Sequence, residues 1–128
     1  MILIIGGMFQ GKKEYVRSRF GLELEDMADG VTCSFEELFC CRGIYHFHEW
    51  VRRMLQEKRD LTDLAEKLRK ENPEILIISN EMGYGVVPVD AFDREYREAT
   101  GRVCTRIAQA SSQVHRVVCG IGTVIKNG

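Results

Sequence analysis

Residues 2–13, ILIIGGMFQGKK, decide the fold of this chain. Ile2 to Ile5 form a continuous apolar run of mostly β-branched side chains, which is typical of a buried parallel strand. A glycine-rich turn follows at Gly6–Gly11, and Lys12 to about Phe20 has the pattern of a short helix that stops near Gly21. The segment therefore predicts a strand, a tight loop and a helix in immediate succession.

The loop between that strand and helix fits the pattern Gly-x-x-x-x-Gly-Lys. Its glycines let successive backbone N–H groups point into one cavity, and this cavity and the following helix N-terminus attract phosphate. The lysine of such a motif reaches the terminal phosphates of a nucleotide. We therefore predict a site for ATP or GTP, with an ordinary glycine-rich turn as the alternative. The predicted nucleotide-binding residues are Gly6, Gly7, Met8, Phe9, Gln10, Gly11, Lys12 and Lys13.

Lys13 departs from the motif, which usually places Ser or Thr after the lysine so that a hydroxyl ligates Mg²⁺. An ammonium group cannot coordinate a cation, and it adds a competing positive charge. Two alternatives follow. Either Lys13 points away and a Mg²⁺ ion is held by water and a carboxylate, or metal-assisted transfer is impaired.

The rest of the chain alternates between strand and helix patterns. This alternation predicts an α/β fold with a mainly parallel sheet flanked by helices, in one domain covering residues 1–128. Ligands in such sheets bind beyond the carboxyl ends of the strands, where the loops after Ile5, Ser79 and Cys119 should meet. The further expected strands cover residues 22–28, 74–79 and 114–119, with 123–125 extending or pairing with the last; the further expected helices cover 34–41 (capped by Ser34 and Glu37), 44–58, a segment from Asp60 to Pro73, and 90–112.

Composition excludes several classes of protein. The 128 residues are 45% hydrophobic and 29% charged, and the net charge is −1, so neither nucleic acid nor an anionic membrane is an expected partner. No stretch approaches the roughly 20 apolar residues of a membrane span, and the N-terminal apolar run is too short for a signal peptide, so we expect a cytoplasmic protein. Five cysteines without a C-x-x-C pair argue against a disulfide framework. Cys40, Cys41, His46 and His48 have poor spacing for a metal site.

A second motif, Asn80-Glu81-x-Gly83-x-Gly85-x-Val87-Pro88, follows a buried strand. Its glycines permit close approach of backbone to a ligand, and Glu81 stands where a carboxylate meets a metal, a hydroxyl or a proton. Further on, Arg94 can share a helix face with Arg97 or Arg102 and clamp phosphate. The alternative is a solvated helix with Arg–Glu pairs.

With these motifs the chain resembles the bifunctional adenosylcobinamide kinase / adenosylcobinamide-phosphate guanylyltransferase family. The likeness rests on the N-terminal Ile-Gly-Gly-x-x-x-Gly-Lys, on residues 79–88, on Arg94 through Gly101-Arg102, and on Val118-Cys119-Gly120-Ile121-Gly122 to Lys126. It implies a RecA-like P-loop fold and a nucleotide-dependent kinase that phosphorylates the aminopropanol hydroxyl of adenosylcobinamide. It also implies a second activity that transfers GMP through a guanylylated histidine, and a homotrimer with active sites between subunits.

The chain departs from the family pattern in its middle. Asp29-Gly30-Val31-Thr32 resembles the family's Asp-x-Leu-Thr segment but follows the P-loop helix closely, so we expect the insert that bears the guanylylated histidine to be missing. His46 and His48 come later and are expected to be exposed or half-buried helix residues. Cys104 and Thr105 stand where the family has Asn-Gln. Asp29 is the candidate Mg²⁺ carboxylate, and a simple turn residue is its alternative.

The sequence thus predicts a cobinamide kinase-like phosphotransferase that has lost guanylyltransferase activity. Its alternatives are a nucleotide-binding regulatory or assembly protein and an oligomeric scaffold that binds no nucleotide. The predicted catalytic residues are Lys12, Asp29, Glu81, Arg94 and Arg102, with a corrinoid as the second substrate.

Overall fold

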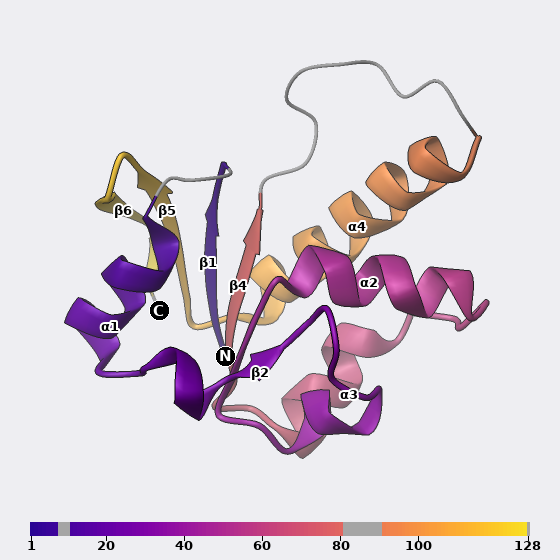
Figure 1. Cartoon of the computed structure of the whole chain (residues 1–128), viewed down its shortest axis with the longest axis horizontal. Coiled ribbons are helices and arrows are strands. Elements are labelled where there is room, and N and C mark those ends of the chain that lie inside the picture. The colour runs from indigo at the N-terminus through magenta and orange to yellow at the C-terminus, as the bar shows by residue number, and fades with distance from the viewer. Residues whose placement is uncertain (8–10, 81–90, 128) are drawn as a thin grey trace.

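A computed structural model describes residues 1–7, 11–80 and 91–127, and within them six strands form one sheet (Figure 1). The strand order is β2-β3-β4-β1-β5-β6, in which the first five strands are parallel and β6 runs antiparallel to β5. This architecture confirms the predicted α/β class. The strands are β1 Ile2–Gly6, β2 Ala28–Asp29, β3 Gly43–Tyr45, β4 Leu76–Asn80, β5 Gln113–Val118 and β6 Ile121–Asn127.

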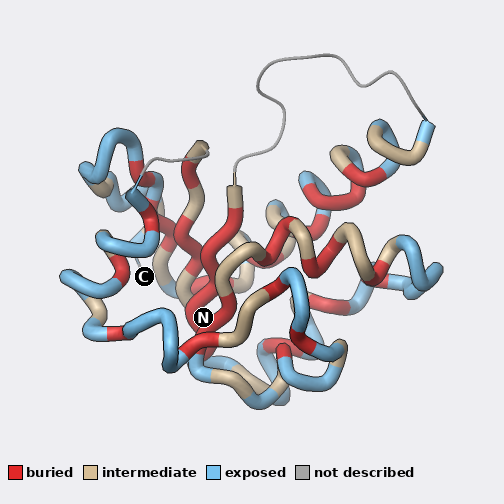
Figure 2. The backbone as a smooth tube through the Cα atoms, in the orientation of Figure 1, coloured by how far each residue is buried: buried red, intermediate tan, exposed pale blue. Residues whose placement is uncertain are grey.

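Helices cover both faces of the sheet (Figures 1 and 2). The N-terminal helix α1, Lys12–Phe20, packs through Val16 on one face, against Ile4 and Val117. The other three helices pack on the opposite face, against Leu3, Ile77 and their neighbours. Because side chains alternate between the two faces of a strand, β1 and β4 contribute to both cores and are buried on both sides. Those three helices are α2 Phe47–Gln56, α3 Leu64–Glu71 and α4 Ala91–Ala110.

Several helix boundaries confirm the local signals in the sequence. Gly21 ends α1 with a φ of 70°, and its N–H donates to the Arg17 carbonyl at 3.1 Å. Ser34 and Glu37 bond each other's backbone N–H groups at 3.2 and 3.3 Å, as a capping box requires. The helix that they open is a short 3₁₀ helix, Glu36–Phe39, and not a longer α-helix.

Two further expectations were wrong. Residues 22–28 do not form a strand: Leu24–Asp26 is a 3₁₀ turn, and β2 begins only at Ala28. Leu22 and Met27 pack against the same core as α1, but Leu24 is exposed along with the acidic residues around it, so the alternation does not mark one buried face. Gly43 does not separate two helices either. It begins β3, which lies between β2 and β4, and α2 starts at Phe47 instead of Ile44.

The register places the carboxyl ends of the central strands together, since Gly6 at the end of β1 pairs with Asn80 at the end of β4. The glycine-rich loop, the start of α1 and the end of β4 therefore meet at one edge of the sheet, as the sequence predicted. Of the helices in the described ranges, none is long and apolar enough to cross a membrane.

Candidate functional site

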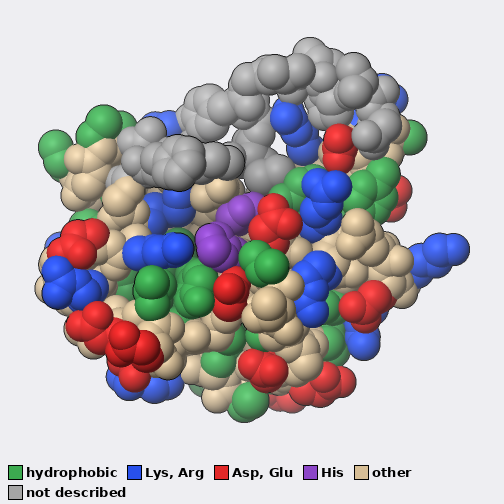
Figure 3. Space-filling view, viewed as in Figure 1, with side chains coloured by type: hydrophobic (Ala, Val, Ile, Leu, Met, Phe, Trp, Pro, Cys, Tyr) green, Lys and Arg blue, Asp and Glu red, His purple; other side chains and the backbone are tan. Residues whose placement is uncertain are grey.

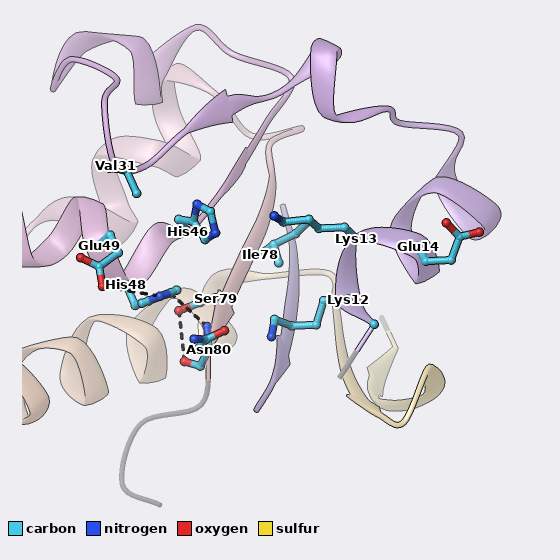
Figure 4. A pocket seen from close by; sticks show the side chains of 11 residues that line it. Lys12, Lys13, Glu14, Val31, His46, His48, Glu49, Ile78, Ser79 and Asn80 are labelled. Carbon is cyan, nitrogen blue, oxygen red and sulfur yellow. Dashed lines mark hydrogen bonds and ion pairs between the residues drawn. The ribbon is translucent and has the colours of Figure 1, made fainter. Parts of the chain in front are cut away.

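A pocket of about 750 Å³ opens at this carboxyl edge (Figure 4). Its size suits a small-molecule ligand. Contributions come from the start of α1, the loop after β2, the start of α2 and the end of β4. The lining residues are Gly11, Lys12, Lys13, Glu14, Val31, His46, His48, Glu49, Ile78, Ser79 and Asn80.

Lys12 lies at the mouth of the glycine-rich loop and is 9% exposed. Its Nζ donates to the carbonyls of Gly6, at 3.2 Å, and Gly7, at 2.7 Å. Gly11 turns the chain into α1 with a φ of 80°, and a Cβ on it would lie 3.1 Å from the Gly120 Cα atom. Glycine is therefore required there both by the backbone conformation and by the close approach of the β5–β6 turn. The loop holds an ammonium group at the first turn of a helix, where anions bind.

Lys13 lines the same pocket. Its Nζ lies 5.0 Å from the centroid of the Tyr45 ring, within range of a cation–π contact. Figure 4 shows both lysine side chains extending from α1 across the pocket. The side chain of Lys13 therefore lies at the pocket, and the two alternatives for Mg²⁺ that the sequence raised stay predictions.

Asp29 and His46 form a bonded pair beside the pocket. The Asp29 Oδ1 atom accepts hydrogen bonds from the Val31 N–H, at 2.9 Å, and from His46 Nδ1, at 3.1 Å. Burial alone would raise the pKa of Asp29, but the Val31 N–H, His46 and Lys13 together lower it below its usual value. The carboxylate is therefore the acceptor, so Nδ1 of His46 carries the hydrogen. Asp29 thus orients His46 as part of the pocket wall.

His46 itself ends β3 with a turn. Its φ of 55° and ψ of 40° lie in the left-handed region, which is uncommon for a residue other than glycine, and it precedes the first residue of α2. This turn brings its ring to within 6.0 Å of the His48 ring, centroid to centroid. Strain of this kind is often stored at functional sites.

His48 is buried, so the expectation of an exposed or half-buried helix residue was wrong. Its Nδ1 accepts a hydrogen bond from the Asn80 N–H at 3.3 Å, which ties the start of α2 to the end of β4. Burial, followed by the charges of His46 and Lys12, lowers the pKa of His48 to about 4. His48 is therefore a neutral structural link at neutral pH.

Arg53 supports the pocket from behind. Its Nη1 donates to the carbonyls of Gly30, at 2.9 Å, and Cys33, at 2.7 Å, and so holds the loop that carries Val31. Nothing in the sequence singled out this arginine, because its partners are backbone atoms distant in the chain.

Other predicted site residues lie elsewhere. Arg94 and Arg102 are exposed on α4, and Arg102 lines a separate hollow with Arg97 and Arg106, so neither arginine lines the lysine pocket. Their role as a phosphate clamp stays a prediction. Met8, Phe9, Gln10 and Glu81 lie outside the described residues.

Among the residues that the structure describes, no group of three or more His, Cys, Asp or Glu side chains could hold a metal ion. Lys13 replaces the residue that usually bears the hydroxyl ligand, and the Asp29 Oδ1 atom already accepts hydrogen bonds from His46 and Val31. The Glu14 carboxylate pairs with Arg17. Two ammonium groups above an apolar floor instead suit the oxygens of a phosphate-bearing ligand.

A parallel sheet with a glycine-rich Gly-Lys loop between its central strand and first helix defines a P-loop nucleotide-binding fold. The chain also matches the model of the cobinamide kinase / cobinamide phosphate guanyltransferase family over residues 38–125. It belongs to that family. The matched region runs from Leu38, inside the 3₁₀ helix Glu36–Phe39, to Ile125, inside β6, and so contains His46, His48 and α4.

Two curated relatives carry the name bifunctional adenosylcobalamin biosynthesis protein CobU. The protein of Salmonella typhimurium is 42% identical over 53 residues, which are 41% of this chain and 29% of the relative. The protein of Escherichia coli is 30% identical over 80 residues, which are 61% of this chain and 44% of the relative. Each match therefore spans less than half the length of the curated relative.

Proposed function

We propose that this protein is a cobinamide kinase-like phosphotransferase of cobalamin biosynthesis or salvage. It transfers the terminal phosphoryl group of ATP or GTP to a hydroxyl group of a corrinoid. The observation that carries the proposal is the pair of lysines at the first turn of α1, which face a pocket at the carboxyl edge of the sheet. The family match supports the substrate class.

In this proposal the described residues act by position and charge. The bond from the terminal phosphorus to the bridging oxygen breaks, and a bond from the same phosphorus to the acceptor oxygen forms. Lys12 stabilises the negative charge on the phosphoryl oxygens, and the α1 N-terminus adds its dipole. Asp29 orients His46 beside the acceptor. Glu81, which follows β4, is our candidate to receive the proton of the acceptor hydroxyl.

We further propose that guanylyltransferase activity has been lost, because Asp29-Gly30-Val31-Thr32 follows α1 closely and leaves no room for the insert that bears the guanylylated histidine in the family. A homo-oligomer, trimeric by family resemblance, is proposed as the assembled form. Its support in this structure is the apolar surface of the β5–β6 hairpin, where Ile121 is 72% exposed.

A second candidate function is a nucleotide-binding regulatory or assembly protein without transfer activity. The observation that favours it is Lys13, which occupies the place of the hydroxyl ligand of active P-loop enzymes. It predicts that nucleotide binds but that no phosphoryl group reaches a corrinoid.

Calorimetric titration with ATP and with GTP tests the binding step, with Lys12→Met as the variant. We expect binding in the wild type and a loss of about tenfold or more in affinity in Lys12→Met, because a charge-assisted contact to phosphate disappears. Lys70→Met, which removes an exposed lysine on α3, is the control and should bind as the wild type does. Equal affinities of Lys12→Met and the wild type would contradict the proposed site.

Incubation with cobinamide and the preferred nucleotide then separates the two candidates. A phosphorylated corrinoid in the mass spectrum supports the kinase, whereas binding without product supports the regulatory protein. After incubation with GTP, the mass of the intact protein is measured as well. A stable GMP adduct would show that guanylyltransferase chemistry has been retained.

A further inference from the structure

We propose that the Lys13 ammonium takes the place of Mg²⁺, so that the pocket binds the phosphates of its nucleotide as a metal-free anion. The inference rests on the proposed function, because it concerns the same nucleotide. It adds to that proposal a specific role for Lys13 and a ligand form, which is a nucleoside di- or triphosphate without a divalent cation.

The first observation is the position of Lys12 and Lys13 in the chain and at the pocket. Lys12 and Lys13 are consecutive residues at the start of α1, and both line one pocket. A side chain in the first turn that follows a Gly-Lys loop stands where a P-loop hydroxyl meets the metal. Lys13 lines the pocket with its Nζ 5.0 Å from the centroid of the Tyr45 ring, so this position contributes a positive charge to the pocket in place of a hydroxyl ligand.

The second step is the arrangement of the two ammonium groups. Lys12 Nζ is drawn back onto the carbonyls of Gly6 and Gly7 at the end of β1. Lys13 Nζ lies on the other side, above the Tyr45 ring at the end of β3. The two ammonium groups of α1 therefore lie near the ends of two different strands, β1 and β3, and phosphate oxygens bound between those strand ends would contact both of them.

The third step concerns the carboxylates, since a metal needs oxygen ligands. The Asp29 Oδ1 atom is bonded to Val31 and His46, and Lys13 is one of the groups that lower the pKa of Asp29. Glu49 lies 3.9 Å from His48 Nε2 through its Oε1 atom. Asp29 is thus already engaged by the protein through Oδ1, and a divalent ion would also meet the repulsion of Lys13.

In this arrangement Lys13 supplies the positive charge that a metal ion would otherwise bring to the phosphates. An ammonium group carries three N–H donors and keeps its charge at neutral pH, so it can both bond and neutralise phosphate oxygens. Affinity should therefore be indifferent to Mg²⁺, and restoration of a hydroxyl at this position should restore dependence on the ion.

Calorimetric titration of ATP, once with excess EDTA and once with Mg²⁺, tests this directly. In the wild type we expect affinities within about twofold of each other in the two buffers. In EDTA, Lys13→Met should bind about tenfold more weakly, whereas Lys13→Arg should stay near the wild type. Lys13→Thr should be weak in EDTA and recover about tenfold or more in Mg²⁺. Lys70→Met is the matched control in both buffers.

Other results would overturn the inference. A wild-type affinity that rises tenfold or more with Mg²⁺ overturns it while the proposed function stands, and this comparison needs no variant. Binding by Lys13→Met that equals the wild type in EDTA also overturns it. If neither ATP nor GTP binds in any buffer, the proposed function fails as well, so the two failures are distinguishable.

Discussion

His48 couples the pocket to pH at the scale of a single residue. Its folded-state pKa of about 4 lies below the ordinary 6.5, so the unfolded chain binds the proton more readily than the folded one does. The contribution to stability is therefore full above about pH 6.5 and is lost as the pH falls toward 4. We expect the free energy of unfolding to fall by about 2 kcal/mol between about pH 7.5 and pH 5 from this group.

His48→Asn tests the assignment, because the amide oxygen of asparagine can accept the Asn80 N–H in place of Nδ1 and does not titrate. Urea unfolding at several pH values should show a shallower pH dependence in this variant than in the wild type. His115 also has a lowered pKa, through burial and then through Arg19, so only the difference between the two proteins isolates His48. Parallel pH profiles would show that His48 is not the titrating group.

At the scale of the elements, Gly30 lies in close contact with the backbone at the end of β3, where His46 forms its left-handed turn. Its N–H donates to the Tyr45 carbonyl at 2.8 Å, and a Cβ on it would lie 2.1 Å from the His46 carbonyl oxygen. Both atoms belong to the backbone at the end of β3, so the elements themselves must move apart. We expect Gly30→Ala to lower the free energy of unfolding by about 2 kcal/mol or more, measured in urea.

Gly101→Ala is the matched control for this close approach. Gly101 lies within α4, and a Cβ on it would meet no described atom within 4 Å. Alanine favours a helix over glycine, so this variant should gain about 0.5–1 kcal/mol. Equal effects of the two substitutions would show that the space beside His46 is not the determining factor.

The elements that the sequence predicted are those with a strong local pattern of their own. Leu3 and Ile4 lie in an apolar run, Gly21 ends its helix by conformation, and α4 is long enough for its period to be unmistakable. Strands β2 and β3 are two and three residues long. Such strands are defined by hydrogen bonds to their neighbours, and three residues beside an amphipathic helix carry no period that could be recognised.

The residues of the candidate site, too, could be predicted only where they belong to a local sequence pattern. Lys12 and Lys13 follow from a contiguous motif, and the structure places both in one pocket. His46 and His48 were set aside because residues two apart diverge on a helix. That geometry does not apply here, since His46 lies before α2 in a left-handed turn that swings its ring toward His48. A backbone turn at a residue other than glycine has no signal in a single sequence.

At the scale of the whole molecule, the edge of the sheet formed by β6 exposes large apolar side chains. Strand β6 is the last in the sheet, and Lys126 ties it to the end of α4 by donating to the Ala108 and Gln109 carbonyls at 3.0 and 2.8 Å. The hairpin that it forms with β5 nevertheless exposes four large hydrophobic side chains, and Figure 3 shows apolar side chains at this corner of the molecule. They are Val118, Ile121, Val124 and Ile125.

An exposed apolar edge strand favours pairing with another chain, so the proposed homo-oligomer should use this hairpin. Light scattering should report a mass above that of one chain for the wild type and a smaller mass for Ile125→Lys, which places a charge on a residue that is 56% exposed. Leu24→Lys is the control, because Leu24 is 42% exposed on the turn after α1, away from β6. A monomeric wild type would contradict the oligomer itself. An oligomer that survives Ile125→Lys but dissociates in Leu24→Lys would instead place the contact on the α1 side of the sheet.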